Sequence, residues 1–148
     1  MQTILSDIDG TVSNNLHRQH FLNNKKDWKN LFINSKDDKP ILPIIEKINS
    51  FQKKYFEIIF ISGRPEEYRQ ITETWLRKYF NFEFEILMRP EKDKRDNVEV
   101  KKYLFNFHLK DREIKLVFEN DEDLCSLWRS KGLEVFKVDR SFLEQHSF

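Results

Sequence analysis

The chain has 148 residues, of which 39% are hydrophobic, 14% aromatic and 34% charged. This length suffices for one hydrophobic core, so we expect a single domain over residues 1–148. The 14 Phe, 3 Trp and 4 Tyr exclude a disordered chain. With 26 Lys and Arg against 25 Asp and Glu, the net charge of +1 excludes a protein that binds nucleic acid through a broadly basic surface.

A single cysteine, Cys125, excludes an internal disulfide and favours a reducing compartment. We expect it to be a buried helix residue. The N-terminal ten residues turn acidic and do not have the pattern of a secretory signal. No apolar run approaches the roughly 20 residues that span a membrane. We therefore expect a cytoplasmic protein with no membrane contact.

Short apolar runs alternate with amphipathic stretches along the chain. The runs have the continuity of strands buried on both faces, at 3–8, 56–61, 84–88, 114–118 and 134–138. Apolar residues three and four apart predict helices at 41–54, 65–79, 98–107 and 124–130. This alternation predicts an α/β fold of three layers, α/β/α, Rossmann-like, around a mainly parallel five-stranded sheet. Residues 13–40 are polar and predict a small cap-like insertion over the sheet's edge.

Polar residues follow several of these strands, at 7–11, 62–64 and 119–121, and Lys101 lies on a later helix. Ligands bind at the carboxyl ends of parallel strands, so we expect these groups to meet there. Clustered carboxylates repel one another and need a cation, and hard oxygen ligands suit Mg²⁺. A lysine and an arginine beside the metal suit a phosphate.

The segment Asp7-Ile8-Asp9-Gly10-Thr11 resembles the DxDGT motif of the haloacid dehalogenase (HAD) superfamily of phosphohydrolases. Ser62, Lys101 and Glu119 then match its second, third and fourth motifs. Residues 61–69, 88–101 and 127–133 resemble more closely the 3′-phosphatase domain of phage polynucleotide kinase/phosphatase, a resemblance that covers about residues 2–142. No G-x-x-x-x-G-K-[ST] kinase loop occurs in the sequence, so we expect a phosphatase without a kinase.

This resemblance implies a role for each residue of the motifs. Asp7 would attack phosphorus and form an aspartyl-phosphate, while Asp9 would act as general acid and then base. Ser62 and Lys101 would bind and neutralise the transferring group. Mg²⁺ would be held by the Asp7 carboxylate, the Asp9 backbone carbonyl and Glu119. The expected substrate-binding residues are Thr11, Arg18, Gly63, Arg64 and Arg95.

Three positions differ from the pattern of these relatives. Glu119-Asn120 stands in place of a pair of aspartates, and Asn97 stands in place of an acid near the lysine of the third motif. Lys92 replaces a glycine in the turn before Asp93. Each departure predicts altered local geometry, with consequences for activity or substrate range.

The expected substrate is a 3′-terminal phosphate on nucleic acid or a nucleotide, in the host cytoplasm if a phage encodes the protein. Two alternatives remain: a phosphatase of free nucleotides or other small phosphoesters, and a non-catalytic module that binds phosphate or metal. Trp28, within the insertion, could cover the site or stack on a base. His17 and His20 fit surface loop positions better than a metal site. Nothing in the sequence indicates a protein partner.

Overall fold

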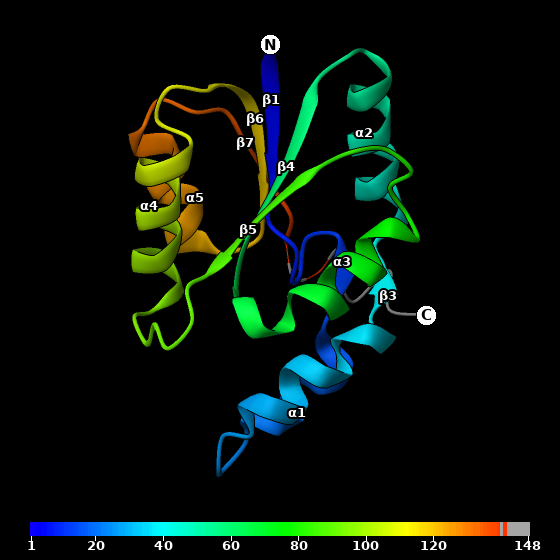
Figure 1. Ribbon diagram of the computed structural model, residues 1–148, viewed down its shortest axis with the longest axis vertical. Coiled ribbons are helices and arrows are strands. Elements are labelled where there is room, and N and C mark those ends of the chain that lie inside the picture. The colour runs from blue at the N-terminus through cyan, green and yellow to red at the C-terminus, as the bar shows by residue number, and fades with distance from the viewer. Residues whose placement is uncertain (140, 142–148) are drawn as a thin grey trace.

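The computed structural model describes residues 1–139 and 141, so the last part of the predicted domain range lies outside the described residues. Five parallel strands form one sheet in the order β5-β4-β1-β6-β7, as Figure 1 shows. They are β1 (Gln2–Ser6), β4 (Glu57–Pro65), β5 (Glu85–Arg89), β6 (Glu113–Glu119) and β7 (Val135–Lys137). The predicted parallel α/β fold is confirmed.

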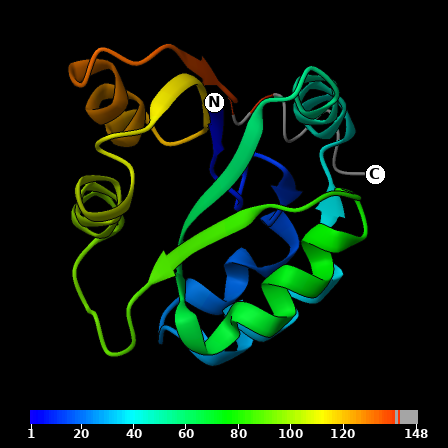
Figure 2. The same cartoon turned by 45° about the horizontal axis from the view of Figure 1, so that its top comes forward.

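Helices cover both faces of the sheet (Figures 1 and 2). One face carries α2 (Leu42–Lys53) and α3 (Arg69–Arg77), and the other carries α4 (Asn97–His108) and α5 (Glu122–Ser130). Side chains alternate along a strand, so each strand contributes to two cores. In β1, Ile4 belongs to the core under α2 and α3, whereas Leu5 belongs to the core under α4 and α5. Continuous apolar runs follow from burial on both faces.

The start of the helix after β4 differs from the prediction. Pro65 was expected at the first helical position, but it is the last residue of β4 and pairs with Arg89 of β5. Its backbone is extended, with ψ of 146°. The register between β4 and β5 shifts between Ile61 and Pro65, so the irregular part of the ladder falls at Ser62, Gly63 and Arg64. The helix begins only afterwards, as a 3-10 turn, η3 (Glu66–Tyr68), that leads into α3.

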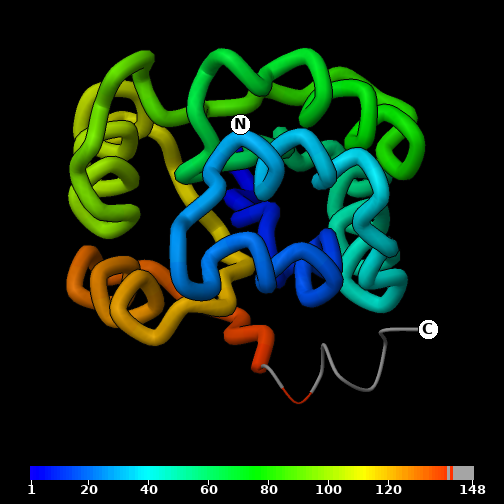
Figure 3. The backbone as a smooth tube through the Cα atoms, turned by 90° about the horizontal axis from the view of Figure 1, so that it is seen from below, coloured from blue at the N-terminus to red at the C-terminus, as the bar shows by residue number. Residues whose placement is uncertain are grey.

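The insertion at 13–40 contains helical turns, which its polar composition did not predict. It consists of β2 (Ser13–Asn14), η1 (Leu16–Leu22), α1 (Trp28–Ile33), η2 (Asn34–Asp37) and β3 (Lys39–Pro40). The antiparallel pairing of β2 with β3 brings the two ends of the insertion together. Seen from below in Figure 3, this blue-to-cyan segment lies across the carboxyl ends of the sheet. Within the described residues, no helix combines the length and apolar character needed to cross a bilayer.

Candidate active site

The candidate site lies where the order of strands reverses. From the central strand β1 the chain passes first to β4 and β5 on one side, and later to β6 and β7 on the other. The connections after β1 and β6 therefore lead to opposite faces of the sheet and leave a crevice at the carboxyl ends. A pocket of about 990 Å³ occupies this crevice, and it is lined among others by Asp7, Asp9, Arg64, Lys101 and Glu119. The predicted meeting of these groups is present in the structure.

Asp7 follows directly on β1 and is held from two sides. Its Oδ1 accepts a hydrogen bond from Lys101 Nζ at 2.6 Å, and its Oδ2 accepts one from Thr11 Oγ1 at 2.9 Å. Burial, and then the charge of Glu119, raise the pKa of Asp7 to about 7 although Lys101 opposes the shift. Thr11 is fully buried, and its hydrogen bond to Oδ2 orients the Asp7 carboxylate.

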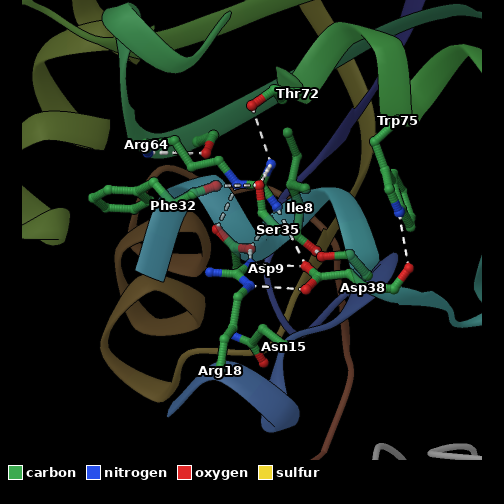
Figure 4. A network of polar contacts seen from close by, with 12 residues as sticks. Ile8, Asp9, Asn15, Arg18, Phe32, Ser35, Asp38, Arg64, Thr72 and Trp75 are labelled. Carbon is green, nitrogen blue, oxygen red and sulfur yellow. Dashed lines mark hydrogen bonds and ion pairs between the residues drawn. The ribbon is translucent and has the colours of Figure 1, made fainter. Parts of the chain in front are cut away.

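Asp9, the second aspartate of the motif, is clamped by two arginines, as the network in Figure 4 shows. Arg64 donates from Nε to Oδ2 at 3.0 Å and from Nη2 to Oδ1 at 2.7 Å, and Arg18 Nη2 donates to Oδ1. Burial alone would raise the pKa of Asp9, but Arg64 and Arg18 hold it well below its usual range. Asp9 is therefore a carboxylate in this structure.

Asp38 completes the clamp, and the sequence reasoning did not find it. Its Oδ1 accepts from Arg18 Nε and its Oδ2 from Arg18 Nη2, each at 2.8 Å, and Arg64 Nη2 lies 3.6 Å from Oδ2. Trp75 Nε1 donates to the Asp38 carbonyl at 2.9 Å and fixes the backbone there. Asp38 lies in a polar, Lys- and Asn-rich stretch, where no spacing distinguishes it from surface acids.

Lys101 and Glu119 form a second buried ion pair beneath Asp7. Lys101 Nζ lies 3.1 Å from Glu119 Oε1, which also accepts from Trp128 Nε1 at 3.2 Å. The other oxygen, Oε2, accepts backbone N–H groups of Asn120 and Asp121 at 3.0 and 3.3 Å. Burial by itself would lower the pKa of Lys101, but Asp7 and Glu119 raise it well above its usual range, so the lysine is charged.

Oxygen donors at the pocket floor fit a hard cation. Asp7 and Glu119 against Lys101 leave one excess negative charge, consistent with the raised pKa of Asp7. Asn120 packs beside Gly10, where an added Cβ would lie 2.3 Å from Asn120 Nδ2, so its amide stands next to the aspartate motif. The described residues contain no group of three His, Cys, Asp or Glu side chains arranged to hold a metal. Mg²⁺ is commonly bound by one or two carboxylates, with waters and substrate phosphate as further ligands, and the Asp7 carboxylate at the pocket is a ligand of that kind.

The end of β4 brings Gly63 and Arg64 to the pocket, whereas Ser62 is not among the residues that line it. Ser62 is buried, and its Oγ accepts the backbone N–H of Arg64 at 3.0 Å. Gly63 lines the pocket, and an added Cβ there would lie 2.2 Å from Asn97 Oδ1. Arg95 stands at the rim, where it pairs with Asp93 at 2.6 Å and keeps 47% of its side chain exposed.

Arg89, at the end of β5, ties the end of β4 to the loop before α4. It donates from Nε to the Gly63 carbonyl at 2.7 Å and from Nη2 to Asn97 Oδ1 at 2.8 Å. Asn97 thus acts as a neutral acceptor at this position. In the same loop, Lys92 has φ of 64°, the left-handed region that glycine adopts most readily. The turn keeps a glycine-like backbone although its residue is a lysine.

The site has the arrangement expected of a HAD-type phosphohydrolase, with Asp7 directly after the central strand, Asp9 two residues on and the buried Lys101 beside Asp7. The family model described as the polynucleotide kinase PNKP phosphatase domain matches residues 1–142. The chain belongs to this family, and it is a HAD-type phosphomonoesterase domain.

Individual relatives agree with this assignment. A protein of Autographa californica nuclear polyhedrosis virus, named for polynucleotide kinase and RNA ligase activities, is 25% identical over 146 residues, which are 97% of this chain and 20% of that protein. The chain thus spans a fifth of this curated relative. A structure titled as the Pnkp1/Rnl/Hen1 complex matches with a TM-score of 0.78 and 24% identity over 93% of this chain and 46% of the other. The class C acid phosphatase of Bacillus anthracis shares the fold, with a TM-score of 0.64 and 16% identity over 93% of this chain and 66% of the other.

Proposed function

We propose that the chain removes a 3′-terminal phosphate from a polynucleotide, in a reaction that passes through an aspartyl-phosphate on Asp7. The observation that carries this proposal is the Asp7 carboxylate, held between Lys101 and Thr11 on the floor of an open pocket. The family description and the kinase-ligase name of the viral relative support a polynucleotide as the substrate.

Asp7 attacks phosphorus in line with the leaving oxygen. Lys101, which is charged, offsets the repulsion between the nucleophile and the phosphate. Thr11 keeps the second oxygen of Asp7 in place, so the attacking oxygen needs no reorientation. Gly63 lines the pocket and offers backbone to the transferred phosphoryl group, and the buried Ser62 directly before it is the hydroxyl that would bind the same group.

Asp9 serves as the acid and then the base. In the free enzyme Arg18 and Arg64 keep it ionised, which is the state required to deprotonate the attacking water. An incoming dianionic phosphate competes for both arginines and adds negative charge beside Asp9, which raises its pKa toward the range of a general acid. The two arginines thus contact both the acid–base group and the substrate.

Mg²⁺ fits the oxygen donors of Asp7, the Asp9 backbone carbonyl and either Glu119 or Asn120. Because Glu119 Oε1 and Oε2 accept hydrogen bonds from Lys101, Trp128 and two backbone N–H groups, we favour the Asn120 amide oxygen as the third donor. When bound, the ion supplies positive charge that screens nucleophile and ester from each other.

The test compares a 3′-phosphorylated oligonucleotide, its 5′-phosphorylated isomer, a nucleoside monophosphate and p-nitrophenyl phosphate, each with Mg²⁺ and with EDTA. We expect Mg²⁺-dependent release of phosphate, fastest from the 3′ end, and at least a roughly 10³-fold loss in Asp7→Asn, as for removal of a covalent nucleophile. Equal rates on the nucleoside monophosphate would favour the small-phosphoester alternative. If no ester is hydrolysed, the remaining alternative is a non-catalytic module that binds phosphate or metal.

A further inference from the structure

An exposed tryptophan lies on the wall of the active-site pocket that the insertion forms. Trp28, the first residue of α1, is 51% exposed and lines the pocket that contains Asp7. The other two tryptophans, Trp75 and Trp128, are buried. The proposed hydrolysis of phosphate uses no aromatic group, so an indole presented to this pocket calls for a binding role.

Trp28 is part of a stacked pair. Phe32, one helical turn later in α1, lies with its ring centroid 6.2 Å from that of Trp28 and with 16° between the ring planes. Phe32 also lines the pocket and packs its ring against Tyr68 of η3, at 5.1 Å between centroids. The two nearly parallel rings form an apolar aromatic pair on the pocket wall, which we call the Trp28–Phe32 platform.

The platform is tied to the catalytic groups. Leu31, between its two aromatic residues, is buried, and its carbonyl accepts a hydrogen bond from Arg18 Nη1 at 3.1 Å. Arg18 is the same side chain that clamps Asp9. A ligand that reaches from the pocket floor to α1 therefore meets two surfaces whose relative position is set by one buried side chain.

Cations lie over the platform and elsewhere along the pocket. Lys26 lies over the Trp28 ring, with Nζ 5.6 Å from the centroid. Lys94 and Arg95, of the loop before α4, are exposed and line the same pocket. An apolar aromatic surface, exposed cations and the Asp7–Lys101 site in one pocket together match a nucleotide that continues into a charged strand.

We propose that the Trp28–Phe32 platform stacks the nucleobase of the terminal nucleotide while its phosphate lies at Asp7, a proposal that rests on the function proposed above. Stacking on an aromatic ring tolerates every base, because each has a π-face. Such stacking also requires that the base is not already stacked on neighbouring bases within a duplex. The substrate class is therefore an unpaired polynucleotide end, with Lys26 displaced from the ring to meet a backbone phosphate.

The kinetic test uses two single-stranded oligonucleotides with a 3′-phosphate, one ending in a normal nucleotide and one in a tetrahydrofuran abasic sugar. We expect the wild type to prefer the base-bearing end in kcat/KM by about tenfold, the size of one lost base–aromatic stack. Trp28→Ala should lower this ratio toward one, and Trp28→Phe should retain most of it. A substitution that damages the site in general lowers kcat/KM for both oligonucleotides, so it leaves their ratio unchanged.

Phe107→Ala is the matched control. Phe107 stacks on Tyr103 one turn earlier in α4, at 5.8 Å between centroids and 26° between planes, and is 68% exposed outside the pocket. This variant removes an equivalent exposed ring and should keep the wild-type ratio. A wild type without preference for the base-bearing end, or a Trp28→Ala variant that keeps the preference, would overturn the proposal.

A binding measurement separates this proposal from the proposed function. Trp28 is the exposed fluorophore, so in Asp7→Asn, which cannot turn over, the base-bearing oligonucleotide should quench tryptophan emission in a saturable way and the abasic one should quench far less. Quenching without turnover of any phosphoester by the wild type would reject the phosphatase function and keep the stacking. Turnover with equal quenching by both oligonucleotides would reject the stacking alone.

Discussion

Replacing Asp38 by Asn should destabilise the protein strongly, because Asp38 balances the charge of two buried arginines. The side chains of Arg18, Arg64 and Asp38 are 2%, 1% and 0% exposed. With Asp9 they form a cluster of two cations and two anions, and the half-exposed His17 ring joins it through a 2.7 Å contact from Nε2 to Asp38 Oδ1. Asp38→Asn keeps the shape of the side chain but leaves one positive charge uncompensated on side chains that are almost fully buried.

The magnitude follows from the cost of breaking a buried ion pair. Removal of one partner of such a pair costs about 3–5 kcal/mol, since the remaining charge stays buried. We expect about 3 kcal/mol, because the Asn carbonyl oxygen still accepts one of the two 2.8 Å bonds from Arg18. For a domain of this size that loss lowers Tm by about 6–12 °C.

Urea denaturation followed by tryptophan fluorescence measures this effect. The control is Glu73→Gln, which breaks the exposed 2.8 Å pair with Arg77 and should cost less than about 1 kcal/mol. The double variant Arg18→Gln/Asp38→Asn removes the unbalanced charge and should be more stable than the sum of its two single variants predicts. If Asp38→Asn costs no more than Glu73→Gln, the charge balance of the cluster does not stabilise the fold.

Three further predictions concern single positions. Gly10 and Gly132 both have positive φ, 82° and 79°, but only at Gly10 would a Cβ meet Asn120. Gly132→Ala should therefore lower the free energy of unfolding in urea by about 1 kcal/mol, whereas Gly10→Ala should lower it clearly more and also abolish phosphate release. Equal losses of stability in the two variants would contradict this prediction. Burial raises the pKa of Cys125 to about 11, so a thiol reagent at pH 8 should label the native protein far more slowly than the urea-unfolded chain, and equally fast labelling would disprove it. The pKa of Asp7 rises from 3.8 to about 7 on folding, so between these values the folded state binds more protons and stability falls as pH rises. In EDTA, the free energy of unfolding of the wild type should fall relative to that of Asp7→Asn between pH 5 and pH 8. A difference between the two proteins that does not change with pH would contradict the raised pKa of Asp7.

Local patterns predicted the sheet and the paired aspartates. The apolar run at 56–61 marks β4 because only a strand buried on both faces needs such continuity. Asp7 and Asp9 were found because a specific motif follows directly on such a strand. Both features depend on neighbours in sequence, so sequence alone is sufficient to predict them.

Pro65 marks the limit of local rules. A proline before two glutamates predicts a helix start, yet pairing with β5 draws Pro65 into the strand. Polar composition likewise did not predict the helical turns of the insertion, whose Leu31 and Phe32 pack toward the site. In both cases contacts distant in sequence outweigh local preference.

The sequence by itself determined the sheet, the aspartate motif and the chemistry that these imply. Only the tertiary structure decided which charges meet: Asp38, 20 residues from Arg18, turns an arginine expected to face substrate into one held also between two carboxylates. It likewise placed Trp28 in the pocket that contains Asp7. The physical reason is that an ion pair or a stacking surface depends on distance in space, and the packing of the insertion on the sheet sets those distances.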